Sequence, residues 1–426
     1  MNIAFGGFLL LLFSGMPIVF ALGVAAMLAL ILLVDVPLII MAQRMYGGIN
    51  SFSLMAIPFF VTAGLVMAEG GIARRFVDLA TALVGWIRGS LYLVAITTGT
   101  GLAAISGSGS ADTAAVGSIL APEMKKRGYD PDMTASVIAA AGSLAPIIPP
   151  SIIMVIIAIT SNLSIGAMFL GGVVPGLVIA VALSFTCWLY AGRRGSQVLD
   201  RQPFSWVTLG RCFVAALPGL TLPVIVVGGI VGGVFTATEA ACVAVITTVM
   251  ISLFIHREIG LTDLPRIFLR AIGLSAAVLM IVATASVFSW LIASLGVPQL
   301  LGAWFSDFTT SAIVFLLVVN ILLLIVGMFM ESISAILIIL PVLMPIAVSY
   351  GIDPVQFGVM TALNLSIGLI TPPYGICLYV AAMVSGRRVE QVSTRVWIPL
   401  IPMILVLLLT AYVPAFVLTL PRLFFP

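Results

Sequence analysis

Residues 143–151, SLAPIIPPS, place three prolines inside an apolar stretch that is long enough to cross a membrane. Residues 368–375, GLITPPYG, repeat this pattern near the other end of the chain. Proline removes a backbone donor and clashes with the carbonyl group four residues earlier, so each stretch predicts a helix that is broken in its middle. Inside a membrane such a break is tolerated only where protein or water covers it. The two breaks therefore predict a buried polar site.

The composition predicts an all-α, polytopic membrane protein. Of the 426 residues 62% are hydrophobic and 8% are charged, and the mean hydropathy is +1.30. Apolar runs of about 17 to 25 residues, the length that spans a bilayer as a helix, recur along the chain, whereas the alternating ten-residue strands of a barrel are not seen. We expect the first such segment, residues 3–34, to be a spanning element that is retained.

Several classes of function find no support in the sequence. The net charge of +3 comes without a basic stripe with interleaved aromatic residues, which argues against nucleic acid as a partner. The four cysteines lack CxxC spacing, so no metal or disulfide motif is indicated. No nucleophile and base pair, HExxH motif or P-loop is present, so neither an enzyme nor an ATP-driven pump is predicted.

The two proline breaks belong to an internal repeat. A shift of 223 positions superimposes seven identical residues. The aligned pairs are Pro122 with Pro345, Gly128 with Gly351, Asp130 with Asp353, Pro131 with Pro354, Ser143 with Ser366, Pro149 with Pro372, and Pro150 with Pro373. This predicts two related halves, residues 1–200 and 201–426, joined by a polar linker.

The distribution of basic residues indicates that the halves are inverted. Lys and Arg collect in cytoplasmic loops. In the first half they occur in the loops 70–90 and 123–128, and the counterparts of these loops in the second half, 293–313 and 346–353, contain none. The reverse holds for the loop 161–166, which is neutral, because its counterpart 385–395 contains three arginines. This assignment puts sixteen of the eighteen Lys and Arg on one face and leaves out Arg44 and Arg422. Such reversal is typical of an inverted repeat.

Each half is predicted to contain a re-entrant hairpin followed by a broken helix. Residues 90–124 begin and end beside basic loops, yet they are too few for two full spans, so we expect a hairpin with its tip at SGSGSAD, residues 106–112. The second hairpin is 311–346, with its tip near MESIS, residues 330–334. The broken helices are 131–160 and 354–385. Carbonyl groups freed at a break can hold a small cation, and half-helix N-termini favour an anion.

Polar residues at the tips and breaks are the candidate ligands of a transported solute. A carboxylate near the middle of a membrane is costly unless it is paired or hydrated, which singles out Asp112 and Glu331. For any one serine, back-bonding to a helix carbonyl is the structural alternative, and a single break is more often a packing kink. The candidate substrate ligands are Ser106, Ser108, Ser110, Asp112, Ser143, Glu331, Ser332, Asn364 and Ser366.

At these residues the sequence resembles the large membrane subunit of the tripartite ATP-independent periplasmic (TRAP) transporters, of the dicarboxylate and sialic-acid type. The resembling stretches cover nearly the whole chain: GGIARR (70–75), AISGSGSADTAAVGSILAPEMKKRGYDP (104–131), AAAGSLAPIIPPS (139–151), GGVFTATEAA (232–241), GIDPVQFG (351–358) and NLSIGLITPPYG (364–375).

The resemblance implies an elevator-type, Na⁺-driven importer of the bacterial inner membrane. It implies two partners, a small four-helix membrane subunit on a separate chain and a periplasmic binding protein that delivers a small organic anion. Carried over by position, one sodium site comprises Ser106, Ser108, Gly142, Ala145 and Ile148, and the other comprises Gly327, Gly368 and Thr371. The hairpin tips of the family are rich in Ser and Ala, whereas this chain has Asp112 close to the first tip. The charge at this tip therefore differs from what the resemblance implies.

Rival functions stay open at this point. A stand-alone Na⁺/dicarboxylate symporter of the same architecture differs only in needing no binding protein. A channel requires a continuous pore, whereas broken helices facing hairpin tips favour occlusion of the solute. A membrane-embedded enzyme lacks a catalytic constellation.

Overall fold

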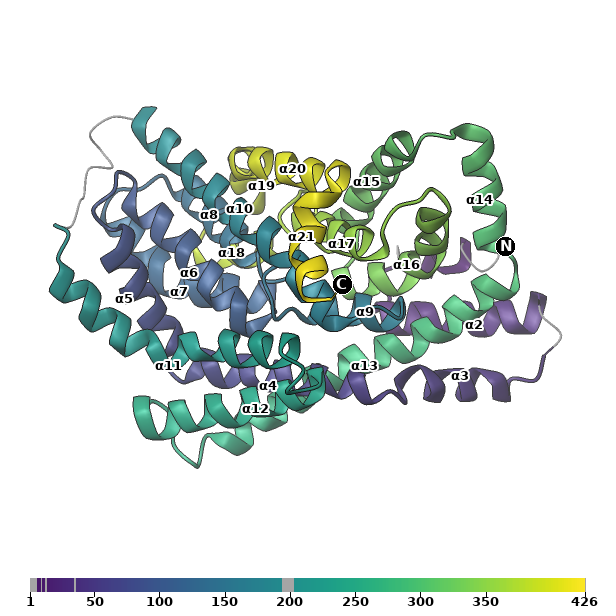
Figure 1. Ribbon diagram of the computed structural model, residues 1–426, viewed down its shortest axis with the longest axis horizontal. Coiled ribbons are helices and arrows are strands. Elements are labelled where there is room, and N and C mark those ends of the chain that lie inside the picture. Colours follow the sequence, from purple (N-terminus) through teal and green to yellow (C-terminus); the bar gives the residue numbers. More distant parts are fainter. Residues whose placement is uncertain (1–5, 9, 12–13, 34–35, 194–202, 426) are drawn as a thin grey trace.

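The computed structural model describes residues 6–8, 10–11, 14–33, 36–193 and 203–425, and this part of the chain contains helices and no strands (Figure 1). The linker residues Arg194 and Arg201 lie outside the described residues. The α-helices are α2 (Ile18–Leu33), α3 (Ile39–Ile49), α4 (Ala56–Glu69), α5 (Ile72–Val84), α6 (Ser90–Ser106), α7 (Gly109–Lys126), α8 (Pro131–Gly142), α9 (Ile152–Thr160), α10 (Ile165–Arg193), α11 (Trp206–Val231), α12 (Ala237–Met250), α13 (Leu264–Ser294), α14 (Val297–Phe308), α15 (Ala312–Phe329), α16 (Ser332–Ser349), α17 (Pro354–Gly368), α18 (Ile376–Val384), α19 (Val389–Ser393), α20 (Trp397–Tyr412) and α21 (Pro414–Phe424).

Both predicted helix pairs are present. Helices α6 and α7 form the first, and α15 and α16 form the second. The tip of the first pair is shorter than the seven residues expected, because left-handed Gly107 ends α6 and extended Ser108 starts α7. Residues 109–112 are therefore helical. Glycine adopts this left-handed conformation without the steric cost of a Cβ atom, which allows the tight turn.

Both predicted breaks are present as well. Helix α8 ends at Gly142 and α9 begins at Ile152, whereas α17 ends at Gly368 and α18 begins at Ile376. In each break the peptide bond between the paired prolines is cis. The starts of α7 and α16, and likewise of α8 and α17, are 223 residues apart, and the starts of α9 and α18 are 224 apart. Asp130 and Asp353 cap α8 and α17 in the same way, each accepting hydrogen bonds from the next two amide groups of the helix.

The two broken helices run antiparallel. The loop after α18 meets the start of α8, where Arg387 donates a hydrogen bond to Asp132 over 2.7 Å. At the opposite end, Ile157 near the end of α9 lies against Gly358 near the start of α17. Between these ends, Ser366 donates a hydrogen bond to the carbonyl oxygen of Ser143, so the breaks meet. This arrangement is what an inverted repeat requires, and the division into residues 1–200 and 201–426 stays a prediction.

The helices form two layers in Figure 1. Helices α2–α4 and α11–α13 form a scaffold layer along the lower edge, in which α4 packs on α12 and both α2 and α3 pack on α13. Above it lie the core helices, α6–α9 and α15–α18. Each broken helix packs on the other hairpin, α9 on α16 and α18 on α7. Each half of the sequence therefore completes the core of the other.

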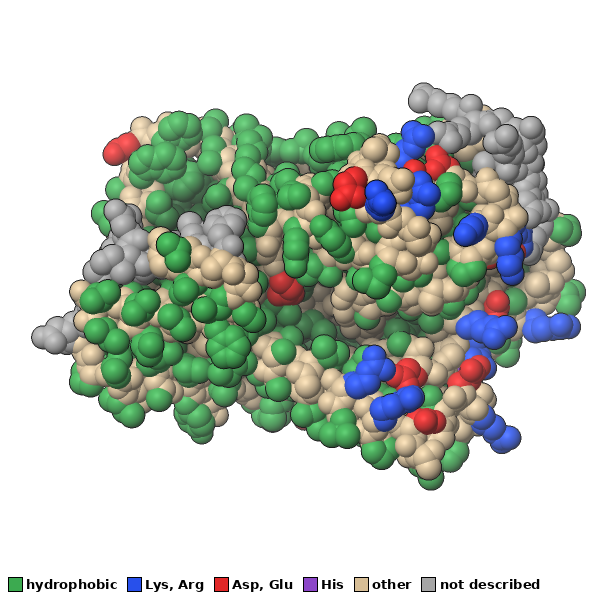
Figure 2. Space-filling view, turned by 180° about the vertical axis from the view of Figure 1, so that it is seen from behind, with side chains coloured by type: hydrophobic (Ala, Val, Ile, Leu, Met, Phe, Trp, Pro, Cys, Tyr) green, Lys and Arg blue, Asp and Glu red, His purple; other side chains and the backbone are tan. Residues whose placement is uncertain are grey.

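The surface is that of a membrane protein. Among the described residues, seven helices are long and apolar enough to cross a bilayer, or eight if α20 and α21 form one bent span. Figure 2 shows Lys and Arg side chains gathered at one end of the long axis, while hydrophobic side chains cover most of the other end. The basic end is the one at which α5 lies in Figure 1. This polarity agrees with the predicted basic face.

Candidate functional site

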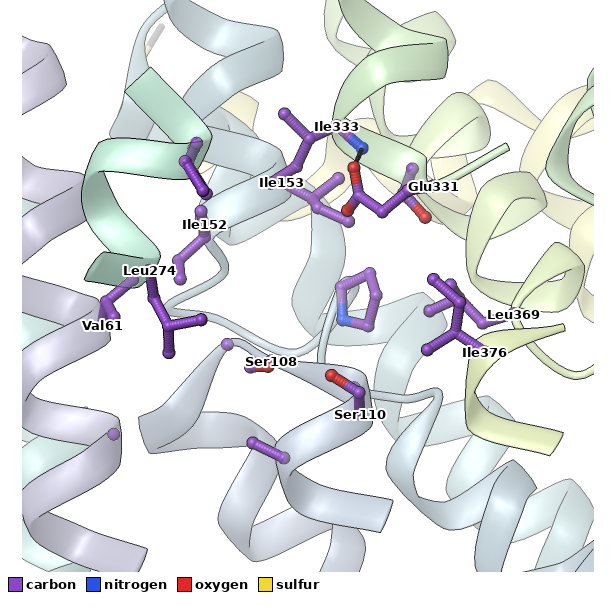
Figure 3. A pocket seen from close by; sticks show the side chains of 18 of the residues that line it. Val61, Ser108, Ser110, Ile152, Ile153, Leu274, Glu331, Ile333, Leu369 and Ile376 are labelled. Atoms are coloured by element: carbon purple, nitrogen blue, oxygen red, sulfur yellow. Dashed lines mark hydrogen bonds between the residues drawn. The ribbon is translucent and has the colours of Figure 1, made fainter. Parts of the chain in front are cut away.

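A cavity of about 510 Å³ lies where both hairpin tips meet both helix breaks. Figure 3 shows Glu331 of the second tip on one side and Ser108 and Ser110 of the first tip on the other. The core helices supply the rest of this wall from the breaks, with Pro146, Ile152, Ile153, Leu369 and Ile376. The scaffold layer lines the remaining side of the cavity with apolar side chains from α2, α4 and α13. Both tips thus end at one shared space inside the protein.

Five helices begin at this cavity: α2 of the scaffold layer, and α7, α9, α16 and α18 of the core. The N-terminus of a helix carries unpaired amide groups and a partial positive charge, so it attracts an anion. Ser151 caps α9 and Glu331 caps α16 with their side chains, but the capping positions of α7 and α18, Ser108 and Gly375, make no side-chain cap hydrogen bond. At the start of α18, however, the amides of Cys377 and Leu378 donate to the carbonyl oxygen of Leu369 over 3.0 and 3.4 Å. The start of α7 is therefore the better candidate for holding an anionic group.

Glu331 is positioned by the backbone of its own helix. Its carboxylate accepts hydrogen bonds from the amide groups of Ile333 and Ser334, at 3.0 and 3.3 Å. The next residue, Ser332, also lines the cavity, and its buried hydroxyl has no hydrogen-bond partner in the described structure. The second tip thus presents a fixed acceptor and an unused hydroxyl to a solute.

Asp112 lies behind the cavity wall and is 2% exposed. Ser106 donates a hydrogen bond of 2.5 Å to its Oδ1 atom, and the Ser108 amide donates to the Ser106 hydroxyl over 3.1 Å. The Oδ2 atom has no hydrogen-bond partner in the described structure. Asp112 therefore holds the first tip in shape, whereas the prediction had it as a direct ligand.

The first set of sodium-site candidates is drawn together where the first tip touches the first break. A Cβ atom added at Gly107 would lie 3.1 Å from the amide nitrogen of Ile152, and one added at Gly109 would lie 3.3 Å from the carbonyl oxygen of Gly142. Ser106 and Ser108 of the tip thus adjoin the break that contains Ala145 and Ile148, both of which are buried.

The second set lies at the equivalent place in the other half. Gly327 of α15 contacts the last residue of α17, since a Cβ atom added at Gly368 would lie 2.7 Å from the Gly327 backbone. The amide of Thr371 donates to the carbonyl of Gly368 over 3.1 Å, and its hydroxyl donates to Ile367 over 2.7 Å. Backbone oxygens and a hydroxyl are hard ligands of the kind that a small cation prefers.

Besides Asp112, three more predicted substrate ligands lie away from the cavity wall. Ser143 and Ser366 are buried at the crossing of the breaks, where Ser143 donates to the carbonyl of Ala140 over 2.9 Å. Asn364 is buried between α17 and α15 and donates to the side-chain oxygen of Asn320 over 2.8 Å. These residues join core helices to one another.

The chain matches the DctM component of the tripartite ATP-independent periplasmic transporters over residues 5–416. The chain belongs to this family. It is 40% identical to the C4-dicarboxylate TRAP transporter large permease protein DctM of Rhodobacter capsulatus, over 99% of this chain and 98% of that protein. It is 38% identical to the sialic acid TRAP transporter large permease protein SiaM of Vibrio cholerae, over 98% of this chain and 97% of that protein.

The fold resembles that of a solved transporter structure. The YdaH transporter of Alcanivorax borkumensis, whose topology is described as unusual, matches with a TM-score of 0.60 at 15% identity, over 90% of this chain and 88% of that chain. With its candidate spans, this DctM-family chain is a multi-pass protein of the bacterial inner membrane, and its relatives are transport permeases and not enzymes.

The sequence reasoning missed the scaffold side of the site. Val61 of α4, and Leu274 and Ile281 of α13, line the cavity of this DctM-family chain. They are ordinary apolar residues in long helices, and no local motif distinguishes them from residues that face lipid. Only the packing of the scaffold layer on the core identifies them.

Proposed function

We propose that the chain imports a small organic anion together with Na⁺, as the large membrane subunit of a three-part transporter. The observation that carries this proposal is the cavity at which the uncapped start of α7, in the first hairpin tip, faces the second hairpin tip and both breaks. Helix N-termini attract the anion without a basic side chain. The relatives named for C4-dicarboxylate and sialic acid indicate the class of solute, a small carboxylic acid.

Sodium coupling is supported by the two sets of backbone and hydroxyl oxygens beside the cavity. The sets lie at equivalent places in the two halves, each where a hairpin packs on a break. We propose that sodium bound there fixes the tips against the breaks and so shapes the anion site, which couples the two solutes. The core helices would then move against the scaffold layer, in the manner of an elevator.

The partners follow from the family. The name tripartite, with the word periplasmic, supports a soluble binding protein that delivers the anion and a small membrane subunit on another chain. Reconstitution in liposomes tests this. We expect uptake of the labelled anion only with the small subunit, the periplasmic binding protein of the same system and an inward Na⁺ gradient. Uptake of free anion without the binding protein would instead establish a stand-alone symporter, and uptake driven equally by K⁺ would contradict sodium coupling.

Thr371 offers a sharper test of the second sodium site. Removing its hydroxyl in Thr371→Ala takes away one hard ligand, so we expect the Na⁺ concentration for half-maximal uptake to rise at least about tenfold, the factor that corresponds to about 1.4 kcal/mol. Thr371→Ser should keep near-normal sodium dependence.

The matched control is Thr186→Ala in α10, which removes a comparable bond, a hydroxyl donating to the carbonyl four residues earlier over 2.8 Å. An unchanged sodium dependence in Thr371→Ala would remove Thr371 from the site.

A further inference from the structure

A second, small pocket lies where α7 ends, α8 begins and α18 ends. Its volume is about 100 Å³. Four of its lining residues carry polar side chains suited to an anion: Lys125, Thr134, Ser385 and Arg387. Two of them come from each half of the sequence. The pocket is separate from the central cavity, with which it shares no lining residue.

The pocket has two cations at its rim, and they differ in how they are held. Arg387 is fixed by the hydrogen bond from its Nε atom to Asp132, at 2.7 Å. This hydrogen bond raises the pKa of the guanidinium above its ordinary value, so the group stays charged. Lys125 makes no ion pair within the described part of the chain and has no aspartate or glutamate beside it in the pocket lining. Its ammonium group is available to a ligand.

Two buried hydroxyls line the same pocket without a partner. Thr134 is 3% exposed, and the Oγ atoms of Thr134 and Ser385 have no hydrogen bond in the described structure. Other hydroxyls in the same helices behave differently. Thr113 of α7 and Ser136 of α8 each donate to the carbonyl four residues earlier, at distances of 2.7 and 2.8 Å. A buried polar atom without a hydrogen-bond partner is unfavourable, which favours a ligand at this place.

The arrangement is not a by-product of the internal repeat. The positions 223 residues away from these four residues hold Val348, Phe357, Asn162 and Ser164, none of which is charged. The pocket is therefore particular to the end of the core at which α18 meets α8. That end belongs to the basic face predicted to lie in the cytoplasm.

We propose that this pocket binds a phosphate oxyanion, either free phosphate or the phosphate of an anionic lipid headgroup. A tetrahedral anion offers several acceptor oxygens, which match two hydroxyl donors, an ammonium and a guanidinium around a small volume. The bound anion joins α7 and α8 to the loop after α18. It thereby bridges the two halves at the end of the core, away from the transported solute.

Binding to the purified full-length chain tests the proposal. Equilibrium dialysis with labelled inorganic phosphate at constant ionic strength, with chloride as the balancing ion, should show one saturable site per chain. Lys125→Ala should weaken this binding at least about tenfold, and Thr134→Val should weaken it severalfold while preserving the shape of the side chain. Lys126→Ala removes the same charge from the next residue, which does not line the pocket, and should bind as the wild type does.

A second arm separates the two sources of phosphate. Native mass spectrometry in detergent would compare phosphatidylglycerol with diacylglycerol, which lacks the phosphate. Retention of one phosphatidylglycerol that depends on Lys125 and Thr134, without binding of free phosphate, identifies a lipid headgroup. Two outcomes overturn the proposal: saturable binding of neither probe, or losses in Lys126→Ala equal to those in Lys125→Ala. Because Thr134→Val is nearly isosteric, it serves as the test if Lys125→Ala fails to fold.

Discussion

At the scale of single residues, Gly327 and Gly368 bring the backbones of two core helices into close contact. A methyl group at Gly368 would lie 2.7 Å from the backbone of Gly327, so even alanine must separate α15 from α17. We expect Gly368→Val to destabilise the protein by about 1 to 3 kcal/mol, the usual cost of overpacking. We also expect it to abolish sodium-dependent uptake, which a liposome assay on correctly inserted protein would measure.

The control for this substitution is Gly273→Ala in α13, because a Cβ atom there would have no neighbour within 4 Å. Because alanine has a higher helix propensity than glycine, the melting temperature of Gly273→Ala should equal or exceed that of the wild type. Normal uptake by Gly368→Val would show that the close contact of the two glycines is not part of the transport site.

The sequence identified two carboxylates as candidate site residues, but it could not show which of them faces the cavity. Glu331 was singled out because a carboxylate in an apolar segment is costly, and the structure places it in the cavity wall. The same argument singled out Asp112, but the side chain turns inward to accept a hydrogen bond from Ser106. Sequence gives the cost of burying a charged group and not the direction in which a side chain points. The binding of a solute by either carboxylate stays a prediction.

At the scale of elements, each break depends on how the second half-helix restarts. Ser151 starts α9, since its hydroxyl accepts a hydrogen bond from the Met154 amide and donates one to the carbonyl of Pro146, at 3.3 and 2.7 Å. Ser151→Ala removes both and should cost about 1 kcal/mol for the lost cap. Because the hydroxyl also ties the break to the helix start, we expect uptake to fall severalfold, measured as the initial rate per inserted protein.

Ser205 provides the comparison, as it caps α11 through the Thr208 amide at the edge of the protein. Ser205→Ala should lower the melting temperature by a similar or smaller amount and leave uptake unchanged. Equal losses of uptake in both variants would mean that general destabilisation, and not the geometry of the break, limits transport.

Element boundaries were predictable where glycine and proline punctuate the chain. Helices α8 and α17 begin at the prolines expected, Pro131 and Pro354. The first hairpin tip was expected to be longer, because serine and glycine favour turns locally. In the structure Gly107 alone supplies the left-handed turn, and the residues after Ser108 join α7. Tertiary packing of α7 on α8 favours the helix over the local turn preference.

At the scale of the whole molecule, the antiparallel broken helices predict on which side of the membrane equivalent positions of the two halves lie. Helix α7 ends at Lys126 and α16 ends at Ser349, at equivalent places in halves that we predict to be inverted. In a chain with its four cysteines replaced by alanine, Lys126→Cys and Ser349→Cys should react with an impermeant thiol reagent from opposite sides of the membrane. Arg388→Cys should react from the same side as Lys126→Cys, because the loop after α18 meets the start of α8.

Labelling of positions 126 and 349 from one side would exclude the inverted arrangement. The inverted arrangement could be predicted from the sequence, because the reversal of the basic loops can be recognised without knowing how the helices pack. It could not predict that each half completes the other, with α9 on α16 and α18 on α7, because contacts between apolar helices leave no local pattern.

The uncapped start of α7 has a consequence for how such a protein changes over evolutionary time. Peptide dipoles are present whatever the side chains are, and they have no proton to gain or lose. Substitutions around the cavity can therefore reshape the space for one acid or another while the pull on negative charge persists. A single scaffold of this kind can therefore come to carry a different acid after a few substitutions in the cavity wall.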